Sequence, residues 1–148
     1  MRSKNIKLLS LIIPVYHQER TIRKQLQNII GELELLATPY EVIVVVDCLD
    51  DKCFEEAKKV HSDKITVTGY KTNHGKGYAV RFGMGKSHGD VIGFLDAGGD
   101  LSELGLSMMT EHYKWYNADI IIGRKRHPVS KVAYPIARKI LSWGYQQL

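Results

Sequence analysis

The chain lacks most of the features that mark secreted, zinc-binding and membrane-spanning proteins. It has only two cysteines, Cys48 and Cys53, whose spacing matches neither a zinc-ligand pair nor a disulfide framework. Its six histidines form no HExxH-type motif, and no apolar run approaches the roughly 20 residues needed to cross a bilayer. We therefore expect no zinc site and a protein of a reducing compartment.

We also expect no cleavable signal sequence at the N-terminus. Residues 1–15 (MRSKNIKLLSLIIPV) have a basic start and an apolar stretch, but no small-residue cleavage site follows before Arg20. We interpret the apolar stretch as a buried strand and the chain as a cytoplasmic protein.

Acidic residues are scarce in the last thirty positions. From Asp119 to the C-terminus one acid stands against six bases, whereas the preceding part has fifteen of each. A basic segment suits phosphate groups, a membrane surface or nucleic acid, and a solvated helix face is an equally good interpretation. The six bases lack interleaved aromatic residues of the stacking type, so we expect no nucleic-acid partner.

Apolar runs and helical periodicities alternate along the 148 residues. Strands are predicted for Leu8–Val15, Glu41–Asp47, Ile65–Tyr70, Val91–Leu95 and a short segment, Ile120–Gly123. Helices are predicted for Thr21–Leu36, Lys52–Val60, part of Asn73–Asp90, the stretch with Leu104, Met108 and Tyr113, and Lys131–Leu148. This order predicts one α/β domain, built from right-handed βαβ units around a mainly parallel sheet. There is no internal repeat or domain linker, and nothing indicates an oligomeric state.

Polar side chains collect where the predicted strands end. Asp47 and Asp96 end two strands, and Pro14, Tyr16 and Glu19 lie at the end of the first. Because ligands bind outside the carboxyl ends of the strands in open parallel sheets, this edge is the expected site. Loops are polar in any case, so each single residue is as readily interpreted as an ordinary loop residue.

The stretch VIGFLDAGGDLS places two carboxylates on a glycine turn. Gly98 and Gly99 permit a tight turn that allows Asp96 and Asp100 to face one point. Hard divalent cations prefer such oxygen ligands and share their remaining positions with water and substrate phosphates. Taken alone, DAGGD is more often an ordinary turn than a metal site.

A lysine between two glycines precedes this stretch. Lys76, between Gly75 and Gly77, is predicted to open a helix, where its ammonium group and the backbone N–H groups can meet a phosphate. A GKG tripeptide alone is weak support for that role.

Together these motifs resemble family 2 glycosyltransferases, especially polyprenyl-phosphate mannose and glucose synthases. The resemblance is carried by SLIIPVYHQER, EVIVVVDCLDD and NHGKGYAVRFGMGKSHGDVIGFLDAGGDLS, in family order over nearly the whole chain. The chain departs from the family pattern at His17 and Gln18 and at Cys48-Leu49. It also has Gly98 at the position where the family has the second acid of Asp-x-Asp.

The resemblance implies a three-layer GT-A fold, a GDP- or UDP-linked sugar donor, and a divalent metal, Mg or Mn. It assigns the base and ribose to Pro14, Tyr16, Glu19 and Asp47. It places Lys76 near the donor, and it gives the metal and diphosphate to Asp96, with Asp100 in place of the missing second acid.

The implied reaction is inverting transfer of the sugar to an acceptor such as polyprenyl phosphate. Arg124, Lys125 and Arg126 are the candidates for the acceptor phosphate or a lipid surface. The last helix would lie at the cytoplasmic face of a membrane, although core packing is its commoner role. Relatives continue past this helix, so we expect residues 1–148 to be a single domain without the acceptor-side part.

Two other functions fit parts of the pattern. A nucleotide-sugar-binding module without turnover would have the same donor-site residues. A phosphoacceptor signalling domain also places Asp at strand ends, but the acid pair expected directly after the first strand is replaced by Tyr16, His17 and Gln18.

Overall fold

The computed structural model describes residues 5–50, 52–97 and 103–123 of the chain. Strands and helices alternate in the order β1 (Leu9–Val15), α1 (Ile22–Leu35), β2 (Tyr40–Asp47), α2 (Cys53–Lys58), β3 (Ile65–Tyr70), α3 (Lys76–Met84), β4 (Val91–Phe94) and α4 (Glu103–Tyr116). The first four predicted strands and first four predicted helices are therefore confirmed, with small shifts at their ends. The last predicted helix, Lys131–Leu148, lies outside the described residues.

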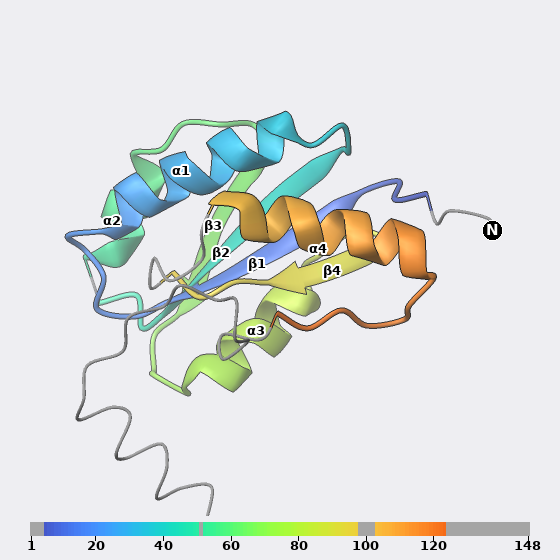
Figure 1. Cartoon of the computed structure of the whole chain (residues 1–148). Coiled ribbons are helices and arrows are strands. Elements are labelled where there is room, and N and C mark those ends of the chain that lie inside the picture. The colour runs from blue at the N-terminus through green and yellow to red at the C-terminus, as the bar shows by residue number, and fades with distance from the viewer. Residues whose placement is uncertain (1–4, 51, 98–102, 124–148) are drawn as a thin grey trace, which may run out of the picture.

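The four strands form one parallel sheet in the order β3-β2-β1-β4. Helices α1, α2 and α4 lie on one face of this sheet, and α3 lies on the other (Figure 1). This makes three layers, as expected for an α/β domain. The chain moves outward from β1 through β2 to β3, then returns to the opposite side of β1 with β4, so the strand order reverses between β1 and β4.

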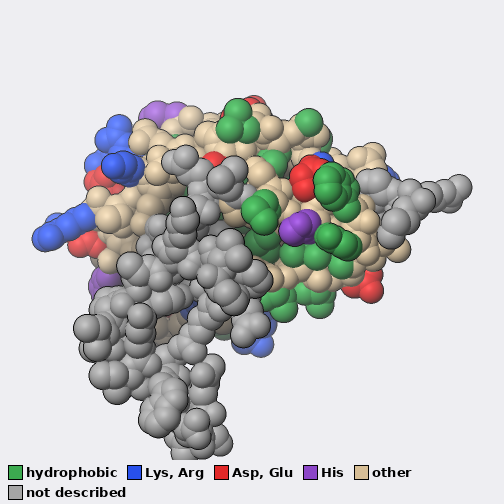
Figure 2. Space-filling model, in the orientation of Figure 1, with side chains coloured by type: hydrophobic (Ala, Val, Ile, Leu, Met, Phe, Trp, Pro, Cys, Tyr) green, Lys and Arg blue, Asp and Glu red, His purple; other side chains and the backbone are tan. Residues whose placement is uncertain are grey.

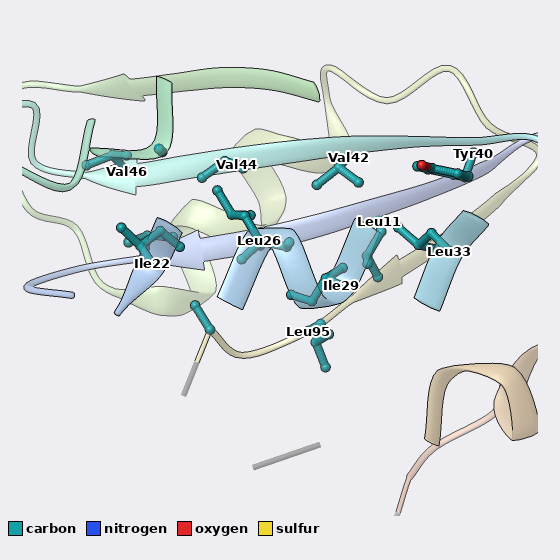
Figure 3. Packing of buried hydrophobic residues seen from close by; sticks show 14 of the residues in the cluster. Leu11, Ile22, Leu26, Ile29, Leu33, Tyr40, Val42, Val44, Val46 and Leu95 are labelled. Carbon is teal, nitrogen blue, oxygen red and sulfur yellow. The ribbon is translucent and has the colours of Figure 1, made fainter. Parts of the chain in front are cut away.

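Strands β1 and β2 are buried on both faces, which explains why their sequences are almost continuously apolar. On one face, alternate residues of both strands meet α1 in the larger core cluster (Figure 3), which includes Leu11, Ile13, Val42, Val44, Val46, Ile22, Leu26, Ile29 and Leu33. On the other face, the intervening Ile12, Ile43 and Val45 meet Ala79 of α3. Each such side chain contributes about 1.5–3 kcal/mol when fully buried, so the two-sided packing of β1 and β2 anchors the domain.

Gly83 lets α3 lie close to the sheet. A Cβ atom at this position would lie 2.6 Å from Cγ2 of Ile12 and 3.1 Å from Cγ2 of Val45, both buried side chains. Glycine in a helix interior costs about 1 kcal/mol relative to alanine, so close packing explains its presence here.

Pro14 marks the end of pairing on only one side of β1. The ladder between β1 and β2 continues to Val15, whereas β4 pairs with β1 only as far as Ile12, whose carbonyl accepts the Leu95 N–H at 2.9 Å. Pro14 follows Ile12 on that same side, where proline's missing N–H leaves no ladder bond unmade. The strands β1 and β4 therefore separate at their carboxyl ends.

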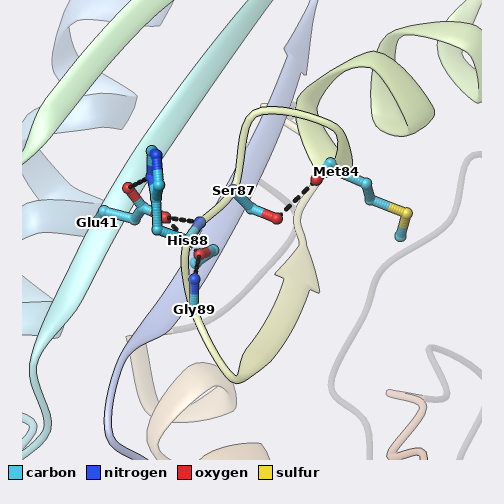
Figure 4. A network of polar contacts seen from close by, with 6 residues as sticks. Glu41, Met84, Ser87, His88 and Gly89 are labelled. Carbon is cyan, nitrogen blue, oxygen red and sulfur yellow. Dashed lines mark hydrogen bonds and ion pairs between the residues drawn. The ribbon is translucent and has the colours of Figure 1, made fainter.

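A network of hydrogen bonds around the carboxylate of Glu41 holds the amino-terminal ends of the strands together (Figure 4). The Ser10 hydroxyl and the His88 N–H donate to Oε1 of Glu41 at 2.5 and 2.7 Å, and the Gly89 N–H donates to Ser10 Oγ at 2.8 Å. Partial burial disfavours the charged carboxylate, but the bonds from Ser10 and His88 outweigh it and hold the pKa of Glu41 below its usual value. These bonds join β1, β2 and the loop before β4.

The structure corrects one expectation next to α4. In this helix Leu106, Thr110 and Tyr113 face the core, whereas Met108 is 57% exposed. Figure 2 shows hydrophobic side chains gathered on the outer face of α4, beside a histidine. Residues 120–123 are not a strand: they pair with no strand among the described residues, and Ile120 and Ile122 are 76% and 83% exposed. An apolar tetrapeptide becomes a strand only where a sheet edge receives it.

Candidate functional site

The carboxyl ends of the strands bring together several of the predicted site residues. Strand order reverses between β1 and β4, and in open α/β sheets this switch point is where ligands bind. Tyr16 follows β1 and is 45% exposed, Asp96 follows β4, and Lys76 begins α3. Tyr16 and Asp96 lie at the strand ends where the sequence predicted them, and Lys76 lies at the start of the helix that it was predicted to open.

Lys76 and Asp96 form an ion pair at this edge. The ammonium nitrogen of Lys76 lies 2.6 Å from Oδ1 and 2.7 Å from Oδ2 of Asp96. About half of each side chain is exposed, 53% for Lys76 and 44% for Asp96, so both charges face solvent. The pair thus offers a cation and a carboxylate together to a ligand at the switch point.

Asp47 lies deeper, at the end of β2. It is 3% exposed, and its two carboxylate oxygens accept the N–H groups of His74 and Gly75 at 2.9 and 2.8 Å. Burial, and then the neighbouring Asp47 carboxylate, raise the pKa of Tyr70 above its usual range. Asp47 is therefore bound to the turn that precedes α3.

Glu19 lines an open hollow with three residues that were not predicted to belong to the site. The hollow has a volume of about 240 Å³ and is lined by Glu19, His17, Asp50 and Lys52. His17 has a φ of 50°, an uncommon conformation for a residue other than glycine, and its ring centroid lies 3.9 Å from that of Tyr16. Asp50 and Lys52 follow β2 as Glu19 follows β1, so their positions just after predicted strands were the available signal.

Of the remaining predicted site residues, one is buried and four lie outside the described part of the chain. Pro14 is buried within β1, so its contribution is to the shape of the strand end. Asp100, Arg124, Lys125 and Arg126 lie outside the described residues.

Asp96 is the described member of the predicted metal pair. Its carboxylate is the kind of hard oxygen ligand that Mg²⁺ and Mn²⁺ accept, and it is accessible at the switch point. Within residues 5–50, 52–97 and 103–123, no group of three or more His, Cys, Asp or Glu side chains is arranged to hold a metal ion. A metal held here would therefore need further oxygen ligands from a substrate, from water or from Asp100.

Among the helices that the structure describes, none combines the length and apolar character required to span a membrane.

The reversal of strand order, with helices on both faces of a parallel sheet (Figure 1), defines a doubly wound α/β domain. Residues 10–144 match the family model for glycosyl transferase family 2, and the chain belongs to this family. The resemblance identified from the three motifs is confirmed.

Curated relatives are enzymes of lipid-linked sugar chemistry. The chain is 34% identical over 133 residues to a dolichyl-phosphate beta-glucosyltransferase of Drosophila melanogaster, covering 80% of this chain and 41% of that protein. It is 31% identical over 100 residues to an undecaprenyl-phosphate 4-deoxy-4-formamido-L-arabinose transferase of Aeromonas hydrophila, covering 66% of this chain and 31% of that protein. The chain thus spans less than half the length of these relatives.

Solved structures of GT-A glycosyltransferases share the fold. The mannosyltransferase PcManGT from Pyrobaculum calidifontis, in complex with GDP-Man and Mn²⁺, matches with a TM-score of 0.59 at 20% identity, covering 74% of this chain and 33% of that one. S. aureus TarS 1–349, in complex with UDP-GlcNAc, matches with a TM-score of 0.58 at 22% identity, covering 71% and 30%. The expected three-layer GT-A fold with a mainly parallel sheet is confirmed.

Proposed function

We propose that this chain is the donor-binding part of a glycosyltransferase that moves a sugar from a GDP- or UDP-linked donor to a polyprenyl phosphate. The observation that carries the proposal is the Lys76–Asp96 pair at the switch point between β1 and β4, in a chain of this family. The curated relatives are named as dolichyl-phosphate and undecaprenyl-phosphate transferases, and these names support the acceptor class. Residues 1–148 would form one domain.

Residues around the hollow are proposed to receive the nucleoside. Tyr16 and Glu19 lie at the end of β1, and Glu19 shares the hollow with His17, Asp50 and Lys52. Carboxylates there can accept hydrogen bonds from ribose hydroxyls and from base N–H groups, and exposed rings offer a face to a base. Pro14, being buried, would shape this end of the strand without touching the donor.

The proposed transfer is a single inverting displacement. An oxygen of the acceptor phosphate attacks the anomeric carbon from the face opposite the leaving group, which inverts the configuration. The bond from that carbon to the diphosphate oxygen breaks, and its electron pair stays on the departing nucleoside diphosphate. Because negative charge develops there, a cation held beside it lowers the barrier, and Lys76 is the described residue in position to do so. An acceptor that is already an anion needs no strong general base.

A divalent metal, Mg or Mn, is proposed as the cofactor of this site. Asp96 and Asp100 would hold it, and when bound it supplies positive charge to the leaving diphosphate. The Mn²⁺ in the PcManGT complex supports this choice for the fold. Arg124, Lys125 and Arg126 remain the candidates for the acceptor phosphate, with the chain peripheral at the cytoplasmic face of a membrane.

A thermal-shift screen tests the donor-binding function. The full chain is heated with GDP, UDP and their hexose conjugates, each with and without Mn²⁺, because a ligand that binds only the folded state raises the midpoint. We expect one nucleotide series to raise the midpoint, more so with Mn²⁺. If neither series does, the donor-binding proposal is wrong.

The alternative, a binding module without turnover, is separated by a second measurement. The selected donor is incubated with the chain and a short-chain polyprenyl phosphate, and free nucleoside diphosphate and lipid-linked sugar are quantified. Binding without either product favours the module.

A further inference from the structure

Two polar side chains lie opposite each other at the carboxyl ends of β2 and β3. Asp47 ends β2 and Tyr70 ends β3, and the parallel register of the two strands pairs these residues. Because side chains alternate between the two faces of a sheet, Asp47 shares its face with Ile43 and Val45, which pack toward α3. Tyr70 packs against the same cluster. The carboxylate and the phenol ring therefore lie on one face of the sheet, below the start of α3.

The ring of Tyr70 is held by other rings. Its centroid lies 5.0 Å from that of Tyr78 and 5.1 Å from that of Phe82, both in edge-to-face arrangements, and 5.4 Å from that of His74. Edge-to-face contacts of this kind are favourable and depend on the ring alone. The place of the Tyr70 side chain is therefore fixed without any contribution from its hydroxyl group.

The hydroxyl group of Tyr70 is buried without a hydrogen bond. Among the residues that the structure describes, none serves as a hydrogen-bond partner for this oxygen. Burial, and then the nearby Asp47 carboxylate, raise the pKa of Tyr70, so the hydroxyl keeps its proton at neutral pH and can donate a hydrogen bond. A buried polar group without a partner destabilises the folded chain, so its presence calls for a reason other than stability.

The neighbouring carboxylate has acceptor capacity to spare. Asp47 accepts the N–H groups of His74 and Gly75 at 2.9 and 2.8 Å, one on each oxygen. An ionised carboxylate offers about four lone-pair positions, so about two remain. One can accept the Tyr70 hydroxyl and another can accept a hydroxyl or N–H group of a ligand.

We propose that Tyr70 is a positioning residue for donor recognition: in the donor complex its hydroxyl donates to Asp47 and orients that carboxylate toward the nucleoside. The inference rests on the proposed function, and on the contact with base and ribose that family resemblance implies for Asp47. In the free chain the hydroxyl has no hydrogen bond to lose among the described residues. Removing it should therefore weaken nucleoside binding without weakening the fold.

Tyr70→Phe tests the inference, because it removes one oxygen and keeps the ring. The full chain and the variant are titrated by calorimetry with uridine, guanosine, UDP, GDP and inorganic diphosphate. We expect the nucleoside that binds, and its diphosphate, to lose affinity by the same factor of about ten, the scale of one hydrogen bond to a charged group. Inorganic diphosphate should bind the variant as it binds the wild type. Unchanged nucleoside affinity, or an equal loss for inorganic diphosphate, would overturn the inference.

Tyr78→Phe is the matched control. It removes a hydroxyl from a neighbouring ring of the same cluster, on a residue that is 39% exposed. All five affinities should stay at their wild-type values. A loss of nucleoside affinity equal to that of Tyr70→Phe would mean that any change in the aromatic cluster suffices, and the inference fails.

A double-mutant cycle separates positioning from direct contact. Asp47→Asn should weaken nucleoside binding, and adding Tyr70→Phe should weaken it no further, because Tyr70 acts through Asp47. If the two losses add, Tyr70 acts independently of Asp47 and is not its positioning residue.

Urea denaturation provides a test that needs no ligand. Tyr70→Phe should unfold at the same urea concentration as the wild type or at a higher one, because the hydroxyl it removes is buried without a partner. A clearly lower midpoint would show a structural bond in the free chain and would overturn the inference. If the wild type binds none of the nucleosides or nucleotides, the proposed function fails. If the wild type binds them and Tyr70→Phe binds them equally well, only the role of Tyr70 is refuted.

Discussion

Glu41 and His88 face each other across the amino edge of the sheet, with the His88 N–H donating at 2.7 Å to Oε1 of Glu41 and its Nδ1 lying 3.1 Å from Oε2. The Ser10 hydroxyl, buried in β1, completes the set of groups around this carboxylate. The bonds favour the charged form, so stability should depend on pH where Glu41 titrates.

The direction in which the free energy of unfolding changes with pH follows from proton binding. The pKa of Glu41 is lower in the folded chain, so on acidification the unfolded chain binds a proton first and folding loses stability. The free energy of unfolding should fall as the pH drops through and below about 4.3, the ordinary value for glutamate. Glu41→Gln should show a shallower fall, measured by urea denaturation at several pH values. Glu55→Gln, on the exposed side of α2, is the control, and a wild-type slope in Glu41→Gln would contradict the assignment.

Gly83→Ala should destabilise the chain although alanine favours helices. The new methyl would lie 2.6 Å from Cγ2 of Ile12, a side chain with no exposed surface, so the core must shift at a cost of about 1–3 kcal/mol. Gly77→Ala in the same helix has nothing within 4 Å of its Cβ and should gain up to about 1 kcal/mol. If the two changes have equal effects on the free energy of unfolding in urea denaturation, helix propensity and not close packing determines the effect of Gly83→Ala.

Much of the fold could be predicted because its signals are local. The run at residues 42–46 is apolar at successive positions because this strand is covered on both faces, and α1 repeats its buried residues at helical spacing. The segment Ile120–Gly123 has the same local pattern without a paired neighbour, and so it was wrongly predicted as a strand. Local pattern does not reveal whether a sheet edge is available.

The positions of the candidate residues were partly predictable, but their contacts were not. Strand ends placed Asp47 and Asp96 at one edge, because parallel strands share that edge, whereas Lys76 was predicted only to open a helix. The partners of Asp47 are backbone N–H groups of His74 and Gly75, which every residue has, so no side-chain motif marks them. The Lys76–Asp96 contact joins residues 20 apart, and it depends on how α3 packs on the sheet.

The two cysteine thiols should differ in reactivity. Cys53 has no exposed surface, and its sulfur accepts the Gln18 N–H at 2.9 Å, whereas Cys48 is only partly buried, in the loop after β2. A thiol reagent such as Ellman's should label Cys48 in the native chain and Cys53 only on unfolding. Cys48→Ser should abolish the fast labelling, and rapid labelling that persists in this variant would contradict the burial of Cys53.

Lys76 and Asp96 should matter more for binding than for stability. An exposed ion pair contributes about 0–1 kcal/mol, so Lys76→Met and Asp96→Asn should each leave the free energy of unfolding within about 1 kcal/mol of wild type.

The effects of Lys76→Met and Asp96→Asn on donor binding should differ in kind. Lys76→Met removes the ammonium group and should weaken nucleoside diphosphate binding with or without Mn²⁺. Asp96→Asn removes a hard oxygen ligand and should abolish the gain in affinity that Mn²⁺ provides, while binding without the metal persists. Calorimetry with and without Mn²⁺ measures the donor affinity of both variants. Asp63→Asn, which changes an exposed acid before β3, is the control. If Asp96→Asn keeps the full Mn²⁺-dependent gain, Asp96 does not hold the metal, and its place at the switch point serves only to orient Lys76.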